Sequence, residues 1–361
     1  MVPFLVPVSN FITKTISYHE CVIYGRKRLN SEIIQWGSEY LKSHGYTLES
    51  HLPEDVQDTP WSYVVRFLTT DGYIYLKHTP KLLALEPTII QILQDQFHAS
   101  VPKVIAHNAE LNCFLMKDAG RPLREILKQQ FDVSLFCKAI HQFTSMQLAV
   151  AGHVNIFLDI GVPDWRLEKL PDLYMQLFSQ KEILIADGLT EREISELEKL
   201  LPKVSRLCQK LSNYAIKPSI VQPDFNDNNT LVDDTSRDIT IIDLGEIVIS
   251  HPFFSLINCL QQAKKHHSLT DEDDTYLKLI DACLKNYMIF VSKKNLLEAF
   301  AIARILFFIY GALGNYRLIA ACDRERLSAS SFQRHGRPSI PLKEFMAGCN
   351  EIDTVLNGNR L

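Results

Sequence analysis

Residues 220–232 read IVQPDFNDNNTLV, and residues 241–245 read IIDLG. In the first stretch a polar loop lies between two short apolar segments, and Asp224 precedes Asn229 by five positions. In the second stretch an apolar run ends at Asp243, which is followed by Leu and Gly. Apolar runs of this length that flank turn-forming residues are typical of buried strands. We therefore expect an acidic and an amide side chain in a loop between strands, and a second acid at a strand end.

This set of side chains fits one kind of chemistry. Phosphoryl transfer from a magnesium nucleotide needs a carboxylate that orients the attacking hydroxyl and hard oxygen ligands for the metal. The spacing Asp-x4-Asn, followed by Asp-x-Gly, is that of a kinase catalytic loop and its metal-binding motif. A single Asp beside a polar loop is more often a turn former, so the order and spacing of the whole set carry the interpretation.

The pattern around this set predicts a two-lobed α+β fold. We expect a helix over residues 31–44, a hairpin of strands 62–68 and 73–77 around the Asp-Gly turn, a helix over 88–97 and strands at 101–105 and 113–116. Beyond Gly120 the pattern is mainly helical, with one strand cluster at 219–222, 230–232 and 239–242. The Thr190–Glu193 pair has the form of a capping box, and Pro202 must kink or end the helix behind it.

Composition excludes several classes of protein. The chain has 361 residues, 46% of them hydrophobic, which is long enough for two lobes. The chain has 38 Lys and Arg residues and 42 Asp and Glu residues, so its net charge is slightly negative. Without a net positive charge that would attract phosphate backbones, we do not expect nucleic acid as a partner. The eight cysteines are scattered singly, which favours reduced thiols over zinc or redox sites.

No membrane span or signal peptide is expected. The longest apolar run, residues 296–313, contains Glu298 and Arg304, which are costly in hydrocarbon and favour a buried core helix. The apolar start, residues 1–8, has two prolines and no preceding cationic region. We therefore expect a cytoplasmic location. Nothing in the sequence indicates the oligomeric state.

The loop QPDFNDNN, residues 222–229, resembles the HGDxHxxN loop of the aminoglycoside phosphotransferase and choline kinase-like family. Residues 242–256, IDLGEIVISHPFFSL, resemble its metal-binding strand and the start of the next helix. The segment YIYLK, residues 73–77, resembles the strand with the nucleotide-phosphate lysine, and residues 101–104 and 115–120 resemble the approach to the hinge. Residues 161–167, GVPDWRL, are similar to a segment of bacterial members. The resemblance runs from about Trp61 to Leu256.

The resemblance implies a two-lobed protein-kinase-like fold, with a small antiparallel-sheet lobe that carries a helix and a larger, mainly helical lobe. The expected boundaries are residues 1–118 for the nucleotide-binding lobe, with residues 1–45 as a helical extension, and residues 119–361 for the catalytic and acceptor-binding lobe. It implies an enzyme that uses Mg²⁺ and ATP or GTP to phosphorylate a hydroxyl of a small molecule.

The resemblance also implies a role for individual residues. Asp224 corresponds to the catalytic base, and Asn229 and Asp243 correspond to the magnesium ligands. Lys77 corresponds to the contact with the α- and β-phosphates, and Glu86 is the candidate partner of that lysine, although Pro87 places it at the edge of a helix. The remaining nucleotide-binding candidates, at the hinge, are Met116, Lys117 and Asp118.

Several positions depart from the family pattern. Gln222 and Asn226 stand where histidines are usual, Pro223 and Asn228 stand where glycines are usual, and no glycine lies between Tyr46 and Trp61 to form a phosphate loop. A catalytically weak or dead nucleotide-binding module is therefore one alternative. An atypical protein kinase is another, but Ser250 follows Asp243 so closely that no activation segment is recognisable.

Two charged clusters outside the loop have simpler interpretations. Residues 271–274, DEDD, could attract a cationic acceptor, but after Thr270 they suit a capped helix N-terminus better. The pair His266 and His267 lacks a third ligand at helical spacing, so we expect a solvated surface there rather than a metal site.

Overall fold

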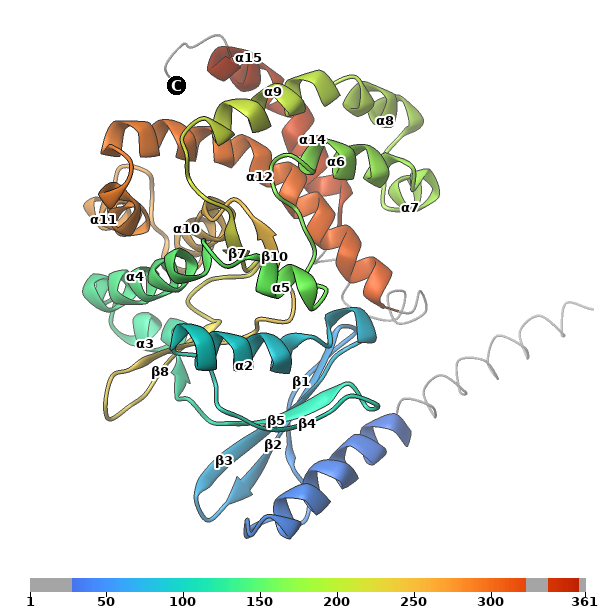
Figure 1. Cartoon of the computed structure of the whole chain (residues 1–361), viewed down its shortest axis with the longest axis vertical. Helices are drawn as coiled ribbons and strands as arrows, with labels where there is room; N and C mark the ends of the chain where they lie inside the picture. The colour runs from blue at the N-terminus through green and yellow to red at the C-terminus, as the bar shows by residue number, and fades with distance from the viewer. Residues whose placement is uncertain (1–27, 323–336, 357–361) are drawn as a thin grey trace, which may run out of the picture. The chain divides into compact units, whose positions relative to one another are not determined.

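The computed structural model describes residues 28–322 and 337–356, which divide into two compact units (Figure 1). The first unit comprises the described residues up to Asp58, then Ser62–Thr79 and Ile105–Asp118. The second comprises Thr59–Trp61, Pro80–Val104 and the described residues from Ala119 onward. The expected helical extension over residues 1–45 falls partly outside the described residues. The lobe boundary at residue 118 stays a prediction.

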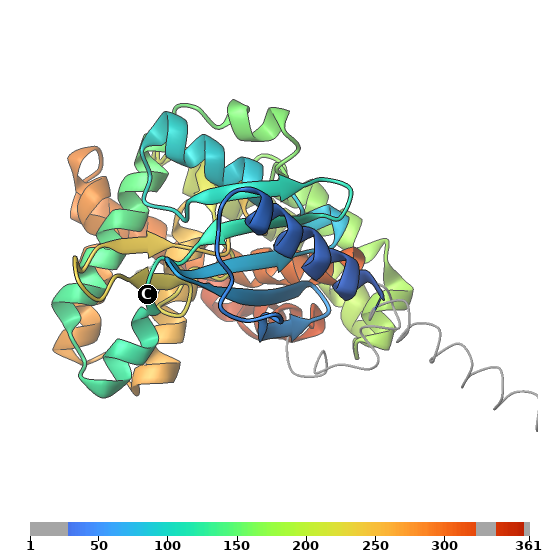
Figure 2. The ribbon, with the colours of Figure 1, turned by 90° about the horizontal axis from the view of Figure 1, so that it is seen from below.

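The first unit is an antiparallel sheet with one helix packed on it (Figure 2). The strands lie in the order β1-β2-β3-β5-β4, namely β1 (Glu54–Thr59), β2 (Ser62–Thr69), β3 (Gly72–His78), β5 (Cys113–Lys117) and β4 (Val104–Asn108). The helix spans residues 28–43 and buries Ile33 and Leu41 against Phe67 and Leu76 of the sheet. A Cβ at Gly37 would lie 3.0 Å from the side chain of Leu76, so this glycine permits close packing.

The predicted hairpin is present. Strands β2 and β3 pair so that Thr69 lies opposite Gly72, which leaves Thr70 and Asp71 as a two-residue loop. Gly72 has a φ of +100°, a conformation that glycine adopts without strain. Two details of the strand prediction were wrong: β1 was missed, and β4 begins at Val104 rather than Val101. The start of β4 is shifted because Pro102 has no N–H for a sheet ladder.

The second unit is mainly helical (Figure 1). It buries large apolar faces of α4, α10 and α12 in a common core. Its helices are η1 (Lys81–Leu83), α2 (Glu86–Phe97), α3 (Leu123–Gln129), α4 (Val133–Val150), α5 (Asn155–Asp159), α6 (Leu170–Phe178), α7 (Lys181–Ala186), α8 (Glu191–Glu198), α9 (Leu201–Ser212), α10 (Phe253–His267), α11 (Asp274–Lys285), η2 (Asn286–Ile289), α12 (Lys293–Ala321), α14 (Ser339–Ala347) and α15 (Cys349–Leu356).

Helix boundaries in this unit follow the capping signals. Thr190 and Glu193 form the predicted capping box at the start of α8, and Pro202 lies in the first turn of α9, so it separates the two helices as expected. The acidic segment 271–274 also leads into a helix. There, however, Asp273 occupies the N-cap position of α11 without a side-chain bond to the helix, and its carboxylate instead accepts a hydrogen bond from the backbone N–H of Thr270 at 2.6 Å.

Short strands in the second unit frame the loop that the sequence singled out. A small sheet has the order β6-β8-β9, with β6 (Arg121–Pro122), β8 (Thr230–Val232) and β9 (Ile239–Ile241), and a strand pair joins β7 (Ser219–Val221) to β10 (Val248–Ser250). The predicted cluster contained β7, β8 and β9 but missed β6 and β10. Both are very short, and β6 contains a proline, so periodicity could not reveal them.

Helix α12 is the element that the sequence assigned to the core. By length and composition it could cross a membrane, but 61% of its most apolar 18-residue stretch is buried inside the protein. The residues that it buries include Leu306, Ile309 and Tyr310. A helix that is apolar on most sides and mostly buried is expected in the core of a protein.

Candidate active site

The loop between β7 and β8, residues 222–229, is fixed by buried polar side chains. Gln222, Asn226 and Asp227 are each at most 3% exposed. Phe225 in the middle of the loop stacks on Phe143 of α4, with ring centroids 3.7 Å apart and ring planes 11° apart. Asp224 itself remains exposed. Most side chains of the loop are therefore buried and hold it in place, whereas Asp224 is exposed.

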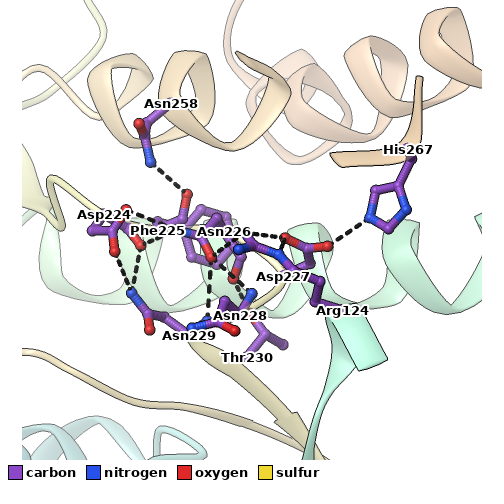
Figure 3. Close-up of polar contacts among 10 residues, drawn as sticks. All are labelled: Arg124, Asp224, Phe225, Asn226, Asp227, Asn228, Asn229, Thr230, Asn258 and His267. Atoms are coloured by element: carbon purple, nitrogen blue, oxygen red, sulfur yellow. Dashed lines mark hydrogen bonds and ion pairs between the residues drawn. The ribbon is translucent and has the colours of Figure 1, made fainter. Parts of the chain in front are cut away.

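Two amide side chains hold the carboxylate of Asp224 (Figure 3). Its Oδ1 accepts a hydrogen bond from Asn226 Nδ2, and its Oδ2 accepts one from Asn229 Nδ2, both at 2.8 Å. Although Asp224 is exposed as a residue, protein atoms surround its carboxylate group. This desolvation and the negative charge of Asp243 raise the pKa of Asp224 to about 6. A carboxylate with a pKa close to neutrality can accept a proton from a hydroxyl.

Asn226 organises the rest of the loop. Its Oδ1 accepts hydrogen bonds from the backbone N–H groups of Asn228 at 2.7 Å and of Asn229 at 3.3 Å, as in an Asx turn. The Thr230 hydroxyl donates to the Asn226 carbonyl at 2.9 Å. The amide that stands in place of the family's second histidine thus bonds both to Asp224 and to the backbone of Asn229.

Gln222 joins this loop to the segment that carries Asp243. Its Nε2 donates to the backbone carbonyls of Ile242 at 2.8 Å and of Asp243 at 3.0 Å. Its own backbone is anchored on α10, because Ser255 Oγ accepts from the Gln222 N–H at 2.8 Å and donates to the Gln222 carbonyl at 3.0 Å. The amide that stands in place of the first histidine is therefore a direct link between the two motifs.

Asp243 lies two residues beyond the end of β9 in a left-handed conformation, with a φ of +63°. Aspartate adopts this region more readily than most residues, because its short side chain can hydrogen-bond locally. The N–H of Ile242 donates to the Asn229 carbonyl at 3.0 Å, so the backbones that carry Asn229 and Asp243 are joined directly. The three residues predicted for the reaction, Asp224, Asn229 and Asp243, are thus brought together in the second unit.

Glu86 belongs to the same unit. It is the first residue of α2, at the helix edge as expected, and it is only 1% exposed. Its Oε1 accepts a hydrogen bond from the N–H of Leu244 at 3.0 Å, and a Cβ at Gly245 would lie 3.1 Å from its Oε2. Glu86 therefore supports the Asp-Leu-Gly turn, a contact that the sequence did not indicate. Its proposed pairing with Lys77 stays a prediction.

The nucleotide-binding candidates lie in the first unit. Lys77 is 5% exposed and occupies β3, where it pairs in register with Phe114 of β5. Met116 and Lys117 end β5, and the N–H of Asp118 donates to the Tyr73 carbonyl at 3.3 Å. The roles of these four residues in nucleotide binding stay predictions.

The oxygen atoms of Asn229 and Asp243 fit a magnesium ion that would take its other ligands from the phosphates of a nucleotide. Because Asn229 Nδ2 donates to Asp224, its Oδ1 is turned away and can act as a ligand together with the Asp243 carboxylate. Magnesium prefers such hard oxygens and usually takes few of them from protein. Among all the described residues, the candidate site included, there is no group of three His, Cys, Asp or Glu that could hold a metal, and the cysteines whose side chains the structure describes are free thiols.

Three side chains around the loop were not predicted: Arg124, Asn258 and His267 (Figure 3). Asn258 of α10 donates to the Phe225 carbonyl at 3.2 Å. His267 was expected on a solvated surface, which was wrong: its side chain is 4% exposed, and its Nε2 lies 2.6 Å from Asp227 Oδ2. Only tertiary packing brings the end of α10 to this loop, so helical spacing within the sequence could not reveal the contact.

The fold is that of kinase-type phosphotransferases. An ethanolamine kinase from Plasmodium vivax superposes with a TM-score of 0.58 at 10% identity over 82% of this chain and 82% of its own. An amicoumacin kinase in complex with AMP-PNP and Ca²⁺ gives 0.52 at 15% identity over 90% and 95%. A macrolide 2'-phosphotransferase type I gives 0.53 at 13% identity over 84% and 96%.

At these identities the similarity shows the fold, and it confirms the predicted kinase-like α+β architecture and the structural resemblance to small-molecule phosphotransferases. No protein-family model matches the sequence, and no curated protein matches it. The geometry of the loop must therefore supply the argument for the reaction itself.

Proposed function

We propose that this protein is a magnesium-dependent phosphotransferase that moves the γ-phosphoryl group of ATP or GTP to a hydroxyl of a small molecule. The observation that carries the proposal is that hydrogen bonds link the segments of Asp224, Asn229 and Asp243. Asn229 donates to the Asp224 carboxylate, the N–H of Ile242 donates to the Asn229 carbonyl, and Gln222 donates to the Asp243 carbonyl. Structural relatives support the choice of co-substrate, since one of them is a kinase in complex with the nucleotide analogue AMP-PNP.

Each of the three residues has a task that its geometry suits. Asp224 is the base: the residue is exposed, and its carboxylate is held by two amides and has a pKa raised to about 6, so it can orient an acceptor hydroxyl and take its proton. Asn229 and Asp243 hold the metal. Bound magnesium supplies positive charge that offsets the charge on the transferred phosphoryl group.

The two alternatives lose support in different ways. A catalytically dead module was motivated by the missing histidines, but Gln222 and Asn226 make the bonds that hold Asp243 and Asp224. A protein kinase would need an activation segment after Asp243. Strand β10 begins at Val248 and α10 at Phe253, which leaves no room for one. A small-molecule acceptor is therefore favoured.

The test is ligand-dependent stabilisation of the wild-type protein and of Asp243→Ala. A ligand that binds only the native state raises the melting temperature. We expect ATP or GTP to raise the melting temperature of the wild type more with Mg²⁺ than with EDTA. In Asp243→Ala the nucleotide should raise the melting temperature no more with Mg²⁺ than with EDTA. A melting temperature that no nucleotide changes, in either protein, would refute the proposal.

A further inference from the structure

A buried polar cluster lies directly behind the catalytic loop, and the reaction itself does not use it. It consists of Arg124 from α3, Asp227 from the loop and His267 from the end of α10 (Figure 3). Their side chains are 16%, 0% and 4% exposed, respectively. The three residues come from distant parts of the chain, so only the fold brings them together.

The carboxylate of Asp227 is fully paired. Its Oδ1 accepts two hydrogen bonds from Arg124, from Nε at 2.9 Å and from Nη2 at 2.8 Å. Its Oδ2 lies 2.6 Å from His267 Nε2. Burial alone would raise the pKa of Asp227, but the bonds from His267 and Arg124 outweigh it and hold the pKa below its usual value. Asp227 is therefore a fixed anion inside the protein.

The two partners of Asp227 are themselves fixed. The ring of Phe131 meets the His267 imidazole edge-on, with centroids 5.0 Å apart, and Phe136 packs against it at 6.3 Å. The N–H of Arg124 donates to the Asp227 carbonyl at 2.9 Å, so backbone and side chain of Arg124 both hold the loop. Phe131 and Phe136 flank the start of α4, so three helices meet at this cluster.

Arg124 also extends the cluster to the reacting residues. Its Nη2 donates to Asn226 Oδ1 at 3.1 Å. The same Oδ1 accepts from the backbone of Asn228 and Asn229, while Asn226 Nδ2 donates to the Asp224 carboxylate. A continuous set of hydrogen bonds therefore runs from His267 through Asp227, Arg124 and Asn226 to Asp224.

A buried ion pair is a poor source of stability, since its desolvation offsets much of its attraction and apolar side chains of similar volume often serve as well. Directional bonds do supply something that apolar packing cannot, namely a fixed orientation of a polar loop. We propose that Arg124, Asp227 and His267 are positioning residues that orient Asp224 and Asn229 for phosphoryl transfer. This inference rests on the proposed function.

The test compares Asp227→Asn with Asp234→Asn. The second change is the matched control, because Asp234 also accepts a bidentate pair of bonds from an arginine, Arg121, but on the exposed surface. We expect Asp227→Asn to lower kcat about tenfold to a hundredfold with nucleotide KM within about twofold, as for lost supporting contacts in other active sites. Asp234→Asn should leave both constants unchanged.

A second readout does not depend on activity. The backbone N–H groups of Asn228 and Asn229 both bond to Asn226 Oδ1, so their hydrogen exchange reports the order of the loop. We expect faster exchange at these amides in Asp227→Asn, with unchanged exchange in α4. Among the histidine variants, His267→Gln, which keeps an N–H donor, should retain more kcat than His267→Ala, while the neighbouring His266→Gln should have no effect.

The outcomes separate the two proposals. If the wild type transfers no phosphoryl group, the proposed function fails, and exchange at Asn228 and Asn229 still decides whether the cluster orients the loop. If Asp227→Asn does not fold, His267→Ala, which removes the partner of Asp227 Oδ2, replaces it in both measurements. The positioning role is overturned if a folded variant keeps wild-type kcat and wild-type exchange at these amides. It is also overturned if the melting temperature falls while kcat is unchanged.

Discussion

The side-chain amide of Gln222 donates a hydrogen bond to the backbone carbonyl of Asp243 at 3.0 Å. The same nitrogen also bonds to the carbonyl of Ile242, so one buried amide holds the two consecutive peptide groups on either side of Asp243. Gln222 follows β7, whereas Asp243 follows β9, and the bond joins the two motifs of the candidate site. A residue that departs from the family pattern thereby supports the proposed metal ligand.

Replacement of Gln222 by Glu tests this support with little change in shape. The carboxylate keeps the length of the side chain but cannot donate, so both carbonyls lose a bond and face a negative charge. We expect Gln222→Glu to lower phosphotransfer at least about tenfold and to weaken magnesium binding. Gln261→Glu, on the exposed surface of α10, is the control and should change neither. Equal activities of the two variants would contradict the role of Gln222.

The raised pKa of Asp224 can be measured in the metal-free protein. We expect its carboxyl carbon to titrate near pH 6 rather than near the ordinary value of 3.8, because of desolvation and the charge of Asp243. Asp243→Asn removes that charge and should lower the pKa of Asp224. Titration of Asp224 near pH 4 in the wild type, or an unchanged pKa in the variant, would show that this electrostatic account is wrong.

His251 makes the stability of the protein dependent on pH. It is 2% exposed, and burial lowers its pKa to about 3 from 6.5. The unfolded chain binds a proton at this residue below pH 6.5, and the native state does not, so stability falls as pH decreases from 6.5 towards 3. Between pH 7 and pH 5 the loss from this residue is about 2 kcal/mol.

The variant His251→Asn isolates this effect. An asparagine Oδ1 can accept the hydrogen bond that the Phe253 N–H donates to His251 Nδ1 at 3.4 Å. Urea unfolding at several pH values should show that the wild type loses about 2 kcal/mol more than this variant between pH 7 and pH 5. The exposed His107→Asn should follow the wild type. Parallel pH profiles for the wild type and His251→Asn would exclude a buried neutral His251.

Gly120 fixes the approach of β6 to β8, the strand that directly follows Asn229. Its φ is +112°, and a Cβ there would overlap the backbone carbonyl of Val232. We expect Gly120→Ala to destabilise the protein by at least about 2 kcal/mol, because both strain and overlap oppose the new methyl group. Gly152→Ala, where nothing lies within 4 Å of a Cβ, should change the free energy of unfolding by less than about 1 kcal/mol. Similar stabilities would contradict this reason for the glycine.

Local signals predicted much of the fold. The hairpin at Thr70 and Asp71, the capping box at Thr190 and the strands on either side of the catalytic loop depend on neighbouring residues, and the structure contains them all. Strands β6 and β10 were missed because each is held by a partner far away in the sequence, Arg121 by Val232 and Val248 by Val221. Their own residues carry no alternation long enough to identify them.

The same distinction applies to the candidate site. Asp224, Asn229 and Asp243 could be predicted as a set because their residue types and spacing match those of a kinase catalytic loop, and the structure places all three in one unit. Their roles in the reaction stay predictions. Arg124 and His267 could not be predicted. Arg124 lies 103 residues from Asp227 along the chain, His267 lies 40 residues from it, and both meet it only in the folded unit. The roles of Lys77, Met116, Lys117 and Asp118 stay predictions.

The central claim is tested most directly by phosphoryl transfer from γ-labelled ATP and GTP, with Mg²⁺, to a panel of small hydroxyl compounds and to water. We predict magnesium-dependent release or transfer of the label by the wild type, a rate at least about a hundredfold lower for Asp224→Asn, and a comparable loss for Asp243→Ala. The account is contradicted if the wild type neither releases nor transfers label, or if Asp224→Asn matches its rate.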